Sequence, residues 1–364
     1  MKHLRGFAGT LVGTMLLAAC RGAAGGLTPT NSALMLGANR SILGMSTVPD
    51  SGHYPHSLGT ARPLQSAAQD TIRRLRIKSN SCCTIAVDAA LNRIYVSRTA
   101  NPSGSNTTVV DGSSFSVVAI VRGFGGANNV DPTTHNVWLP GLYGGNVEVY
   151  SGITNSAVTT VSLGACPVGS WIDGKRRYAW VAAQCGNDHD PVWAINADTY
   201  AIAAGPIRTP GVMGPAIVNP VTGKFYVNKN SGGDFEINPV TFKASPTSFG
   251  VALGVDRLTD LLYAQAANGL NIVDGRSEKI KRTVTLSYAP GFMSVNPRLN
   301  HIYLSAGHNS IEVREGNNGA LLKTLTLASG ANVVSLGAEY KRARIYALAT
   351  SDSYDYLYAI KDIY

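Results

Sequence analysis

Short runs of apolar and β-branched residues recur from about residue 80 to the end of the chain, separated by Asp, Asn and Gly. In seven of these stretches an Asp, Asn or Glu stands seven positions before an aromatic residue. The pairs are Asp88/Tyr95, Asp131/Trp138, Asp173/Trp180, Asn219/Tyr226, Asp256/Tyr263, Asn296/Tyr303 and Glu339/Tyr346. Successive aromatics are 37 to 46 residues apart. A repeat of this length predicts a set of equivalent structural units.

The first unit shows the internal plan. Its apolar runs Thr84–Val87, Arg93–Ser97, Thr107–Val110 and Val117–Val121 are separated by turn-forming residues, a pattern that predicts strands. The acid after the first run suits a turn, because Asp and Asn side chains accept hydrogen bonds from backbone groups two residues on. Four short antiparallel strands in a repeat of about 40 residues describe a propeller blade. The sequence therefore predicts an all-β fold, a seven-bladed β-propeller of four-stranded antiparallel blades.

The last unit is one strand short. Its third run, Tyr356–Ile360, is followed only by residues 361–364. Ahead of the first unit, Thr71–Ile77 has the pattern of a strand, and pairing it with the last unit would leave no blade edge incomplete. We expect this N-terminal strand to complete the last blade and close the ring. An open, frayed seventh blade is the alternative.

Several stretches resemble the repeats of YVTN-type propellers. They are Asn92–Val96, Val110–Gly112, Pro220–Asn228, Val273–Gly275 and Asn296–Leu304. The resemblance covers residues 80–364 and implies the propeller fold. Two units depart from it: the turn of unit three reads Asp173-Gly174-Lys175-Arg176-Arg177, and unit seven has Glu339 in place of Asp or Asn.

The N-terminus resembles that of a bacterial lipoprotein. Lys2 and Arg5 precede the apolar stretch Phe7–Leu17, which is too short to span a bilayer as a helix. It runs into Leu17-Ala18-Ala19-Cys20, which looks like a lipobox. The resemblance implies that the signal peptide 1–19 is removed and Cys20 is lipidated. It also implies anchoring at the bacterial cell envelope, on the outer membrane, facing the periplasm or at the cell surface. An ordinary signal peptide with a chance cysteine is the alternative.

Residues 20–70 show no strand or helix period and are rich in Gly, Ala, Ser, Thr and Pro. A segment of this composition buries too little apolar surface to offset its ordering entropy. We interpret it as a flexible tether between the lipidated cysteine and a propeller over residues 71–364.

Charged residues make up only 15% of the chain, and the formal net charge is +9. Removing Lys2 and Arg5 with the signal peptide leaves 9 − 2 = +7. Such a balance suits anionic partners such as phospholipid headgroups or acidic glycans, or it serves solubility alone. Nucleic acid is not expected as a partner, because export removes the chain from it and basic and aromatic residues do not interleave. We expect a monomer.

Strand direction decides which loops share a face of the ring. Connections from strand two to strand three, and from strand four to the next blade, meet at one face, which we call the top. The turns between strands one and two, and between strands three and four, meet at the bottom. Nine basic residues fall in the bottom turns between strands one and two: Arg93, Lys175, Arg176, Arg177, Lys224, Arg257, Arg298, Lys341 and Arg342. We expect this basic face to lie toward the lipid surface.

Candidate ligand-binding residues map to the top face. They are Arg98, Tyr143, Trp171, Asp188, His189, Asp190, Tyr288, His308 and Tyr354. The aromatic rings could stack on sugars or peptides, or pack the blades. The run Asp188-His189-Asp190 could bind a metal or position a water, or be a solvated loop. Adjacent side chains diverge and no second His lies at ligand spacing, so we expect neither metal nor cofactor.

Four cysteines follow Cys20. Cys166 and Cys185 reach the same end of unit three, and an exported protein can oxidise such a pair, so we expect a disulfide between them. Cys82 and Cys83 are adjacent and bond to each other only in a strained ring, so we expect thiols there.

The sequence holds no Ser/His/Asp order, phosphate-binding Gly-rich loop or CxxCH haem signature. It favours a lipid-anchored envelope protein that presents its top loops to a protein, peptide or glycan. The alternative is an envelope enzyme, a lyase or hydrolase, with its site at the top mouth of the central channel.

Overall fold

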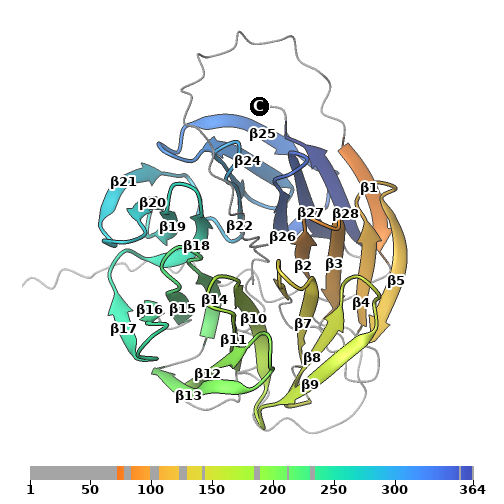
Figure 1. Cartoon of the computed structure of the whole chain (residues 1–364). Coiled ribbons are helices and arrows are strands. Elements are labelled where there is room, and N and C mark those ends of the chain that lie inside the picture. The colour runs from red at the N-terminus through yellow and green to blue at the C-terminus, as the bar shows by residue number, and fades with distance from the viewer. Residues whose placement is uncertain are drawn as a thin grey trace, which may run out of the picture.

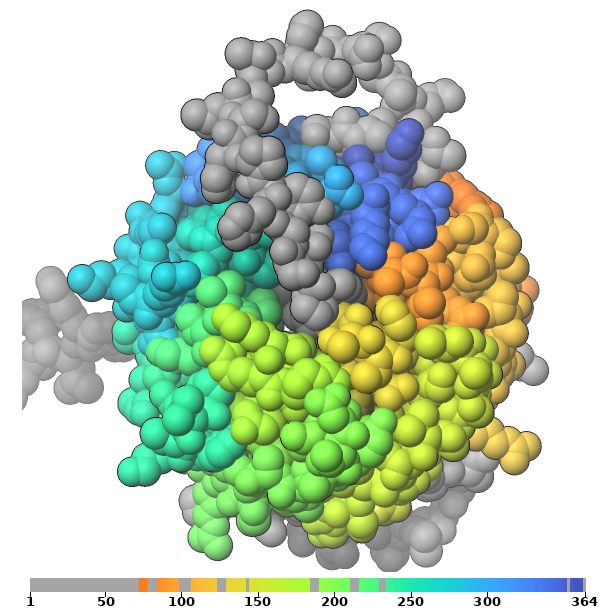
Figure 2. Space-filling view, in the orientation of Figure 1, coloured from red at the N-terminus to blue at the C-terminus, as the bar shows by residue number. Residues whose placement is uncertain are grey.

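The computed structural model describes residues 72–77, 83–98, 106–122, 129–141, 144–183, 189–210, 213–229, 234–351 and 354–362. These residues form seven four-stranded antiparallel sheets arranged around a ring (Figure 1). Neighbouring blades pack side by side around it (Figure 2). The described part of the chain contains no helix, and therefore none that could cross a membrane. The predicted all-β, seven-bladed propeller is confirmed.

Each blade is built from four consecutive strands of its sheet, named in order from the innermost to the outermost. Blade one has β2 (Cys83–Asp88), β3 (Arg93–Arg98), β4 (Asn106–Asp111) and β5 (Ser116–Arg122), and blade two has β6 (Asn129–Val130), β7 (Asn136–Pro140), β8 (Asn146–Ser151) and β9 (Ala157–Ser162). Blade three has β10 (Pro167–Asp173), β11 (Tyr178–Ala183), β12 (His189–Asn196) and β13 (Ile202–Pro210), and blade four has β14 (Met213–Val218), β15 (Phe225–Lys229), β16 (Asp234–Ile237) and β17 (Ala244–Thr247). Blade five has β18 (Val251–Asp256), β19 (Leu261–Ala266), β20 (Gly269–Asp274) and β21 (Ile280–Thr285), and blade six has β22 (Met293–Asn296), β23 (His301–Ser305), β24 (Ser310–Glu315) and β25 (Leu321–Thr326). Blade seven has β26 (Asn332–Glu339), β27 (Arg344–Thr350), β28 (Asp355–Lys361) and finally β1 (Ile72–Ile77), which comes from the other end of the chain.

The core lies between neighbouring blades. All seven aromatics of the repeat, which stand on the second strands, are at most 1% exposed. The packing is direct: the ring of Trp180 in blade three stacks on Phe225 in blade four, with centroids 5.3 Å apart and planes 9° from parallel. Because both flanks of a blade are covered in this way, each blade depends on its neighbours for its buried surface.

The acid of each repeat closes the turn after the first strand. Asp88 Oδ1 accepts hydrogen bonds from the backbone N–H groups of Ala90 and Leu91, 2.9 and 3.0 Å away. Glu339 does the same for Lys341 and Arg342, so its longer side chain replaces Asp without loss of the turn. The fourth residue after each acid has a positive φ: Asn92, His135, Arg177, Gly223, Asp260, Asn300 and Ala343. Units three and seven therefore form the same turn as the rest.

The ring is closed by the first strand of the domain. β1 pairs antiparallel with β28, with Ile72 opposite Ile360 and Ile77 opposite Asp355, as the sequence predicted. β28 is a third strand and runs from top to bottom, so β1 begins at the bottom face. Arg73 also donates hydrogen bonds to the carbonyl oxygens of Ser113 and Ser114 in blade one. The closing strand therefore ties blade seven to blade one (Figure 1).

Deleting residues 71–78 should destabilise the whole domain, since β28 would lose its outer partner and blade one its contact with Arg73. Deleting residues 25–65 is the control and should leave the melting temperature unchanged, because that composition buries little. Thermal unfolding of the two truncated chains measures this. Equal melting temperatures would refute the role of the closing strand.

Candidate functional site

The bottom face is filled by hydrogen bonds between blades. A tyrosine on the second strand of one blade reaches the turn between strands three and four of the next blade. Tyr95 donates to the carbonyl oxygen of Gly152 at 3.4 Å. In blade seven, which has no such turn, Tyr303 of blade six donates to the carboxylate of Asp362, directly after β28. Burial raises the pKa of Tyr95 far above its usual value, so the hydroxyl stays a donor. These phenols hold neighbouring blades together.

The turn acids also bind the next blade. His135 Nδ1 lies 2.7 Å from the buried carboxylate of Asp88. In blade three, Arg177 donates two parallel hydrogen bonds of 2.8 and 2.7 Å to Asp131 in blade two. Burial alone would raise the pKa of Asp131, but the bonds from Arg177 and from the turn outweigh it and lower the pKa. Both basic side chains stand at the positive-φ position of their own turn.

The basic bottom face expected from the sequence is largely occupied by internal bonds. Seven of its nine side chains have partners within the propeller: Arg93, Arg176, Arg177, Lys224, Arg257, Arg298 and Arg342. Lys175 and Lys341 are exposed. The charges cluster there because the turns bring acids and carbonyl groups of two blades together, and this limits their use toward a lipid surface.

Two glutamates meet between blades four and five. Lys224 Nζ lies 2.5 Å from Glu236 Oε2 and 2.7 Å from Glu278 Oε1, and Tyr226 donates to Glu278 at 2.9 Å. Burial, followed by the neighbouring Glu278, raises the pKa of Glu236. For Glu278 the bonds from Glu236, Lys224 and Tyr226 outweigh burial and lower the pKa. The lysine balances one charge of the pair, which makes this cluster a further clamp between blades.

Several predicted top-face residues lie outside the described residues. These are Tyr143, Cys185, Asp188 and Cys82, and the side chains of Arg98 and His189. Cys20, the predicted lipidation site, also lies outside the described residues. Cys166 is half-buried just before β10. Its disulfide with Cys185, like the lipidation of Cys20, stays a prediction.

The described candidates do not form one cluster. Trp171 is 2% exposed and packs on Phe225 with centroids 5.3 Å apart, so its ring belongs to the core and cannot stack on a ligand from solvent. Asp190 is fully buried opposite Thr209 on β13. Tyr288 lies in the connection between blades five and six, and its hydroxyl donates a hydrogen bond to Glu312 on β24. His308 and Tyr354 are exposed at the top. Burial, which the sequence spacing did not reveal, thus removes Trp171 and Asp190 from the ligand-facing set.

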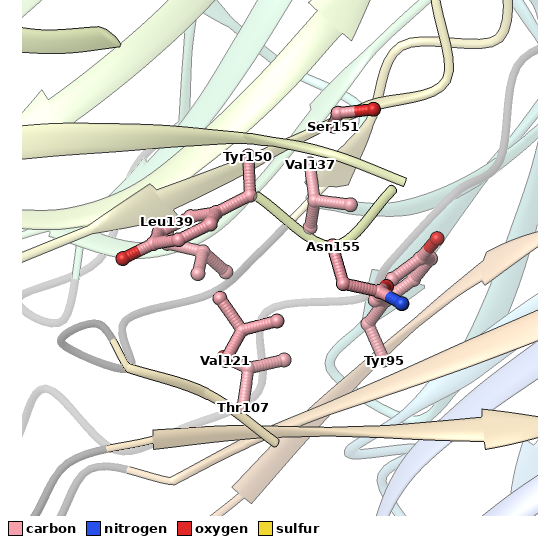
Figure 3. Close-up of a pocket in the computed structure, with 8 residues that line it drawn as sticks. All are labelled: Tyr95, Thr107, Val121, Val137, Leu139, Tyr150, Ser151 and Asn155. Atoms are coloured by element: carbon pink, nitrogen blue, oxygen red, sulfur yellow. The ribbon is translucent and has the colours of Figure 1, made fainter. Parts of the chain in front are cut away.

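A small hollow lies between blades one and two (Figure 3). Its lining is Tyr95, Thr107, Val121, Val137, Leu139, Tyr150, Ser151 and Asn155. The lining carries no charged side chain, and Tyr150 donates its hydroxyl to the carbonyl oxygen of Arg122. The hollow is therefore a packing gap between the two blades.

Asp234 is a buried carboxyl at the top end of blade four that the sequence did not single out. It begins β16, directly opposite Asn228 on β15 and Thr247 on β17. The residue is 5% exposed, and among the described residues its Oδ1 atom and the Thr247 hydroxyl have no hydrogen-bond partner. Burial raises the pKa of Asp234 to about 6. Side chains alternate along a strand, so Asp234 faces blade five, as Glu236 does.

A carboxyl with this pKa can donate or accept a proton near neutral pH. Among the described residues, no group of three His, Cys, Asp or Glu side chains is arranged to hold a metal ion. The described part of the top face therefore holds one carboxyl with a pKa near neutral, and that carboxyl is buried.

The isolation of Asp234 makes stability depend on pH. Folding raises the pKa of Asp234, so the carboxyl contributes fully to the free energy of unfolding below about pH 4. That contribution, about 3 kcal/mol, is lost as the pH rises through about 6. The variant Asp234→Asn should lose this dependence when denaturant unfolding is measured from pH 4 to pH 7.

Asp274→Asn is the control of opposite sign. Bonds from Ser277 lower the pKa of Asp274, so this variant should lose stability at pH 7. Superimposable pH profiles of wild type and Asp234→Asn would contradict a buried, unpaired Asp234.

No family model matches the sequence, and no curated protein matches it. In contrast, 1602 chains of solved structures are similar, so the likeness singles out no function. One is the hydrazine synthase of Kuenenia stuttgartiensis, with a TM-score of 0.59 and 12% sequence identity. The similarity covers 72% of this chain and 91% of that chain. At this identity it supports the fold alone: the chain has the architecture of a seven-bladed β-propeller.

Proposed function

We propose that this chain is a lipid-anchored envelope protein of the YVTN propeller type that binds a protein, peptide or glycan through its top loops. The observation that carries the proposal is the difference between the two faces. In every blade the bottom turn after the first strand places its positive-φ residue four positions after the acid. At the top, the connection from strand two to strand three varies from residues 267–268 in blade five to 99–105 in blade one. Variable loops on a constant scaffold are typical of binding surfaces.

The lipid anchor rests on the lipobox-like stretch ending at Cys20. β1 begins at the bottom face, so the chain before it joins the propeller there. A tether attached there leaves the top loops directed away from the attachment point. This arrangement supports display of the top face to a partner in the envelope.

An envelope lyase or hydrolase is the second candidate, and Asp234 favours it. Its raised pKa fits a general acid or base, and it stands at the top end of a third strand. A single carboxyl lacks the partner that hydrolysis or elimination requires. Binding is therefore the stronger proposal.

A photo-reactive amino acid placed singly in the lipidated chain tests the top face in cells. His308 and Ser287 are exposed at the top, and Val240 and Leu258 are exposed in bottom turns. The top positions should give a discrete cross-linked product, and the bottom positions none. Products from the bottom positions alone would contradict the proposal, as would their complete absence from the top.

A further inference from the structure

The outer rim of blade seven is basic. The closing strand β1 has the sequence Ile-Arg-Arg-Leu-Arg-Ile, and the adjacent β28 adds Lys361. The one acid on these two strands, Asp355, is 2% exposed. No other outer strand of the ring carries three arginines. The rim therefore presents positive charge that no acid of its own two strands balances at the surface.

Two of these arginines are stacked on tyrosines. The guanidinium carbon of Arg74 lies 4.8 Å from the ring centroid of Tyr356, and that of Arg76 lies 3.2 Å from that of Tyr354. Alternation along the strand places both on the side opposite Arg73, which bonds blade one. Both are exposed, and neither forms an ion pair with an acid of the described residues.

Stacking changes what an arginine can bind. The aromatic ring takes the face of the guanidinium and fixes its orientation, while the N–H groups at its edge stay available in a fork that matches phosphate oxygens. Arg74 and Arg76 are two residues apart on one side of a strand, so the forks stand roughly 7 Å from each other. The rim thus offers two oriented anion-binding groups in a row.

We propose that the Arg74–Tyr356 and Arg76–Tyr354 pairs bind the anionic phospholipid headgroups of the membrane in which the protein is anchored. The occupant rests on the lipid anchor proposed above. β1 is the first strand after residues 1–71, so an anchor at Cys20 would keep this rim within the tether's reach of the bilayer and raise its effective concentration there. Ile72, on the same side of the strand, is 38% exposed and adds an apolar contact. The bottom turns are less suited, because most of their basic groups are bonded internally.

The test uses the chain carrying Cys20→Ser, which removes the lipid, mixed with phosphatidylcholine vesicles with or without phosphatidylglycerol. With its rim residues unchanged, this chain should bind only the vesicles that contain phosphatidylglycerol, and its affinity for them should fall as the salt concentration rises. Each Arg near an anionic surface strengthens binding by up to about five-fold, so Arg74→Gln with Arg76→Gln should weaken binding by roughly ten- to twenty-five-fold.

Arg208→Gln with Arg282→Gln is the matched control. Both residues are exposed on the outer strands β13 and β21, and the pair removes the same net charge without touching a stacked arginine. This control should bind nearly as the parent does, and thermal melts verify that both double variants fold.

Equal losses in the two double variants would overturn the proposal, because net charge alone would then explain binding. Binding to an acidic polysaccharide but not to vesicles would overturn it in favour of a glycan. Membrane fractionation of the lipidated wild-type chain tests the anchor independently of the rim. If that chain stays with membranes while the Cys20→Ser chain ignores vesicles, the rim proposal fails and the anchor stands.

Discussion

The structure depends on the hydrogen bonds that an acid or amide at the end of each first strand accepts from the following turn, in most blades from two backbone N–H groups and in blade two from the N–H of Thr133 and the hydroxyl of Thr134. They hold the turn in a conformation that requires a positive φ at its last residue. That conformation starts the second strand in a fixed register, which places the repeat aromatic against the next blade. The blade interface follows from the turn, and the ring follows from seven such interfaces.

This constraint sets the bottom face apart from the top face. Bottom turns cannot vary freely, because their side chains and carbonyl groups bond the adjacent blade, as Arg177 does with Asp131 and Lys224 with Glu278. The top connections differ in length from blade to blade. The rim of blade seven is a third region. Its outer strand comes from the N-terminus, so it alone combines a blade edge with the chain that leads to the proposed anchor.

The sequence predicted the ring well because turn chemistry is local: seven positions from acid to aromatic span one turn and half a strand. Glu339 departs from the Asp or Asn of the other repeats, yet its carboxylate reaches the same N–H groups. Other features depend on contacts between distant segments. Trp171 and Phe225 meet only once blades three and four pack, and Asp234 is buried only once its strand pairs with the strands of Asn228 and Thr247. The stacking of Arg76 on Tyr354 likewise arises only when the first and last strands pair.

Gly316, in the turn between strands three and four of blade six, allows the most direct test of the central claim. A Cβ there would lie 2.7 Å from the hydroxyl of Tyr263 in blade five and closer still to Asn300. Gly291, whose Cβ would meet only Ser305 Oγ at 3.7 Å, is the control. Denaturant unfolding should show a loss of about 1–3 kcal/mol for Gly316→Ala and almost none for Gly291→Ala. Equal stability of the two variants would contradict a ring held together by its bottom turns.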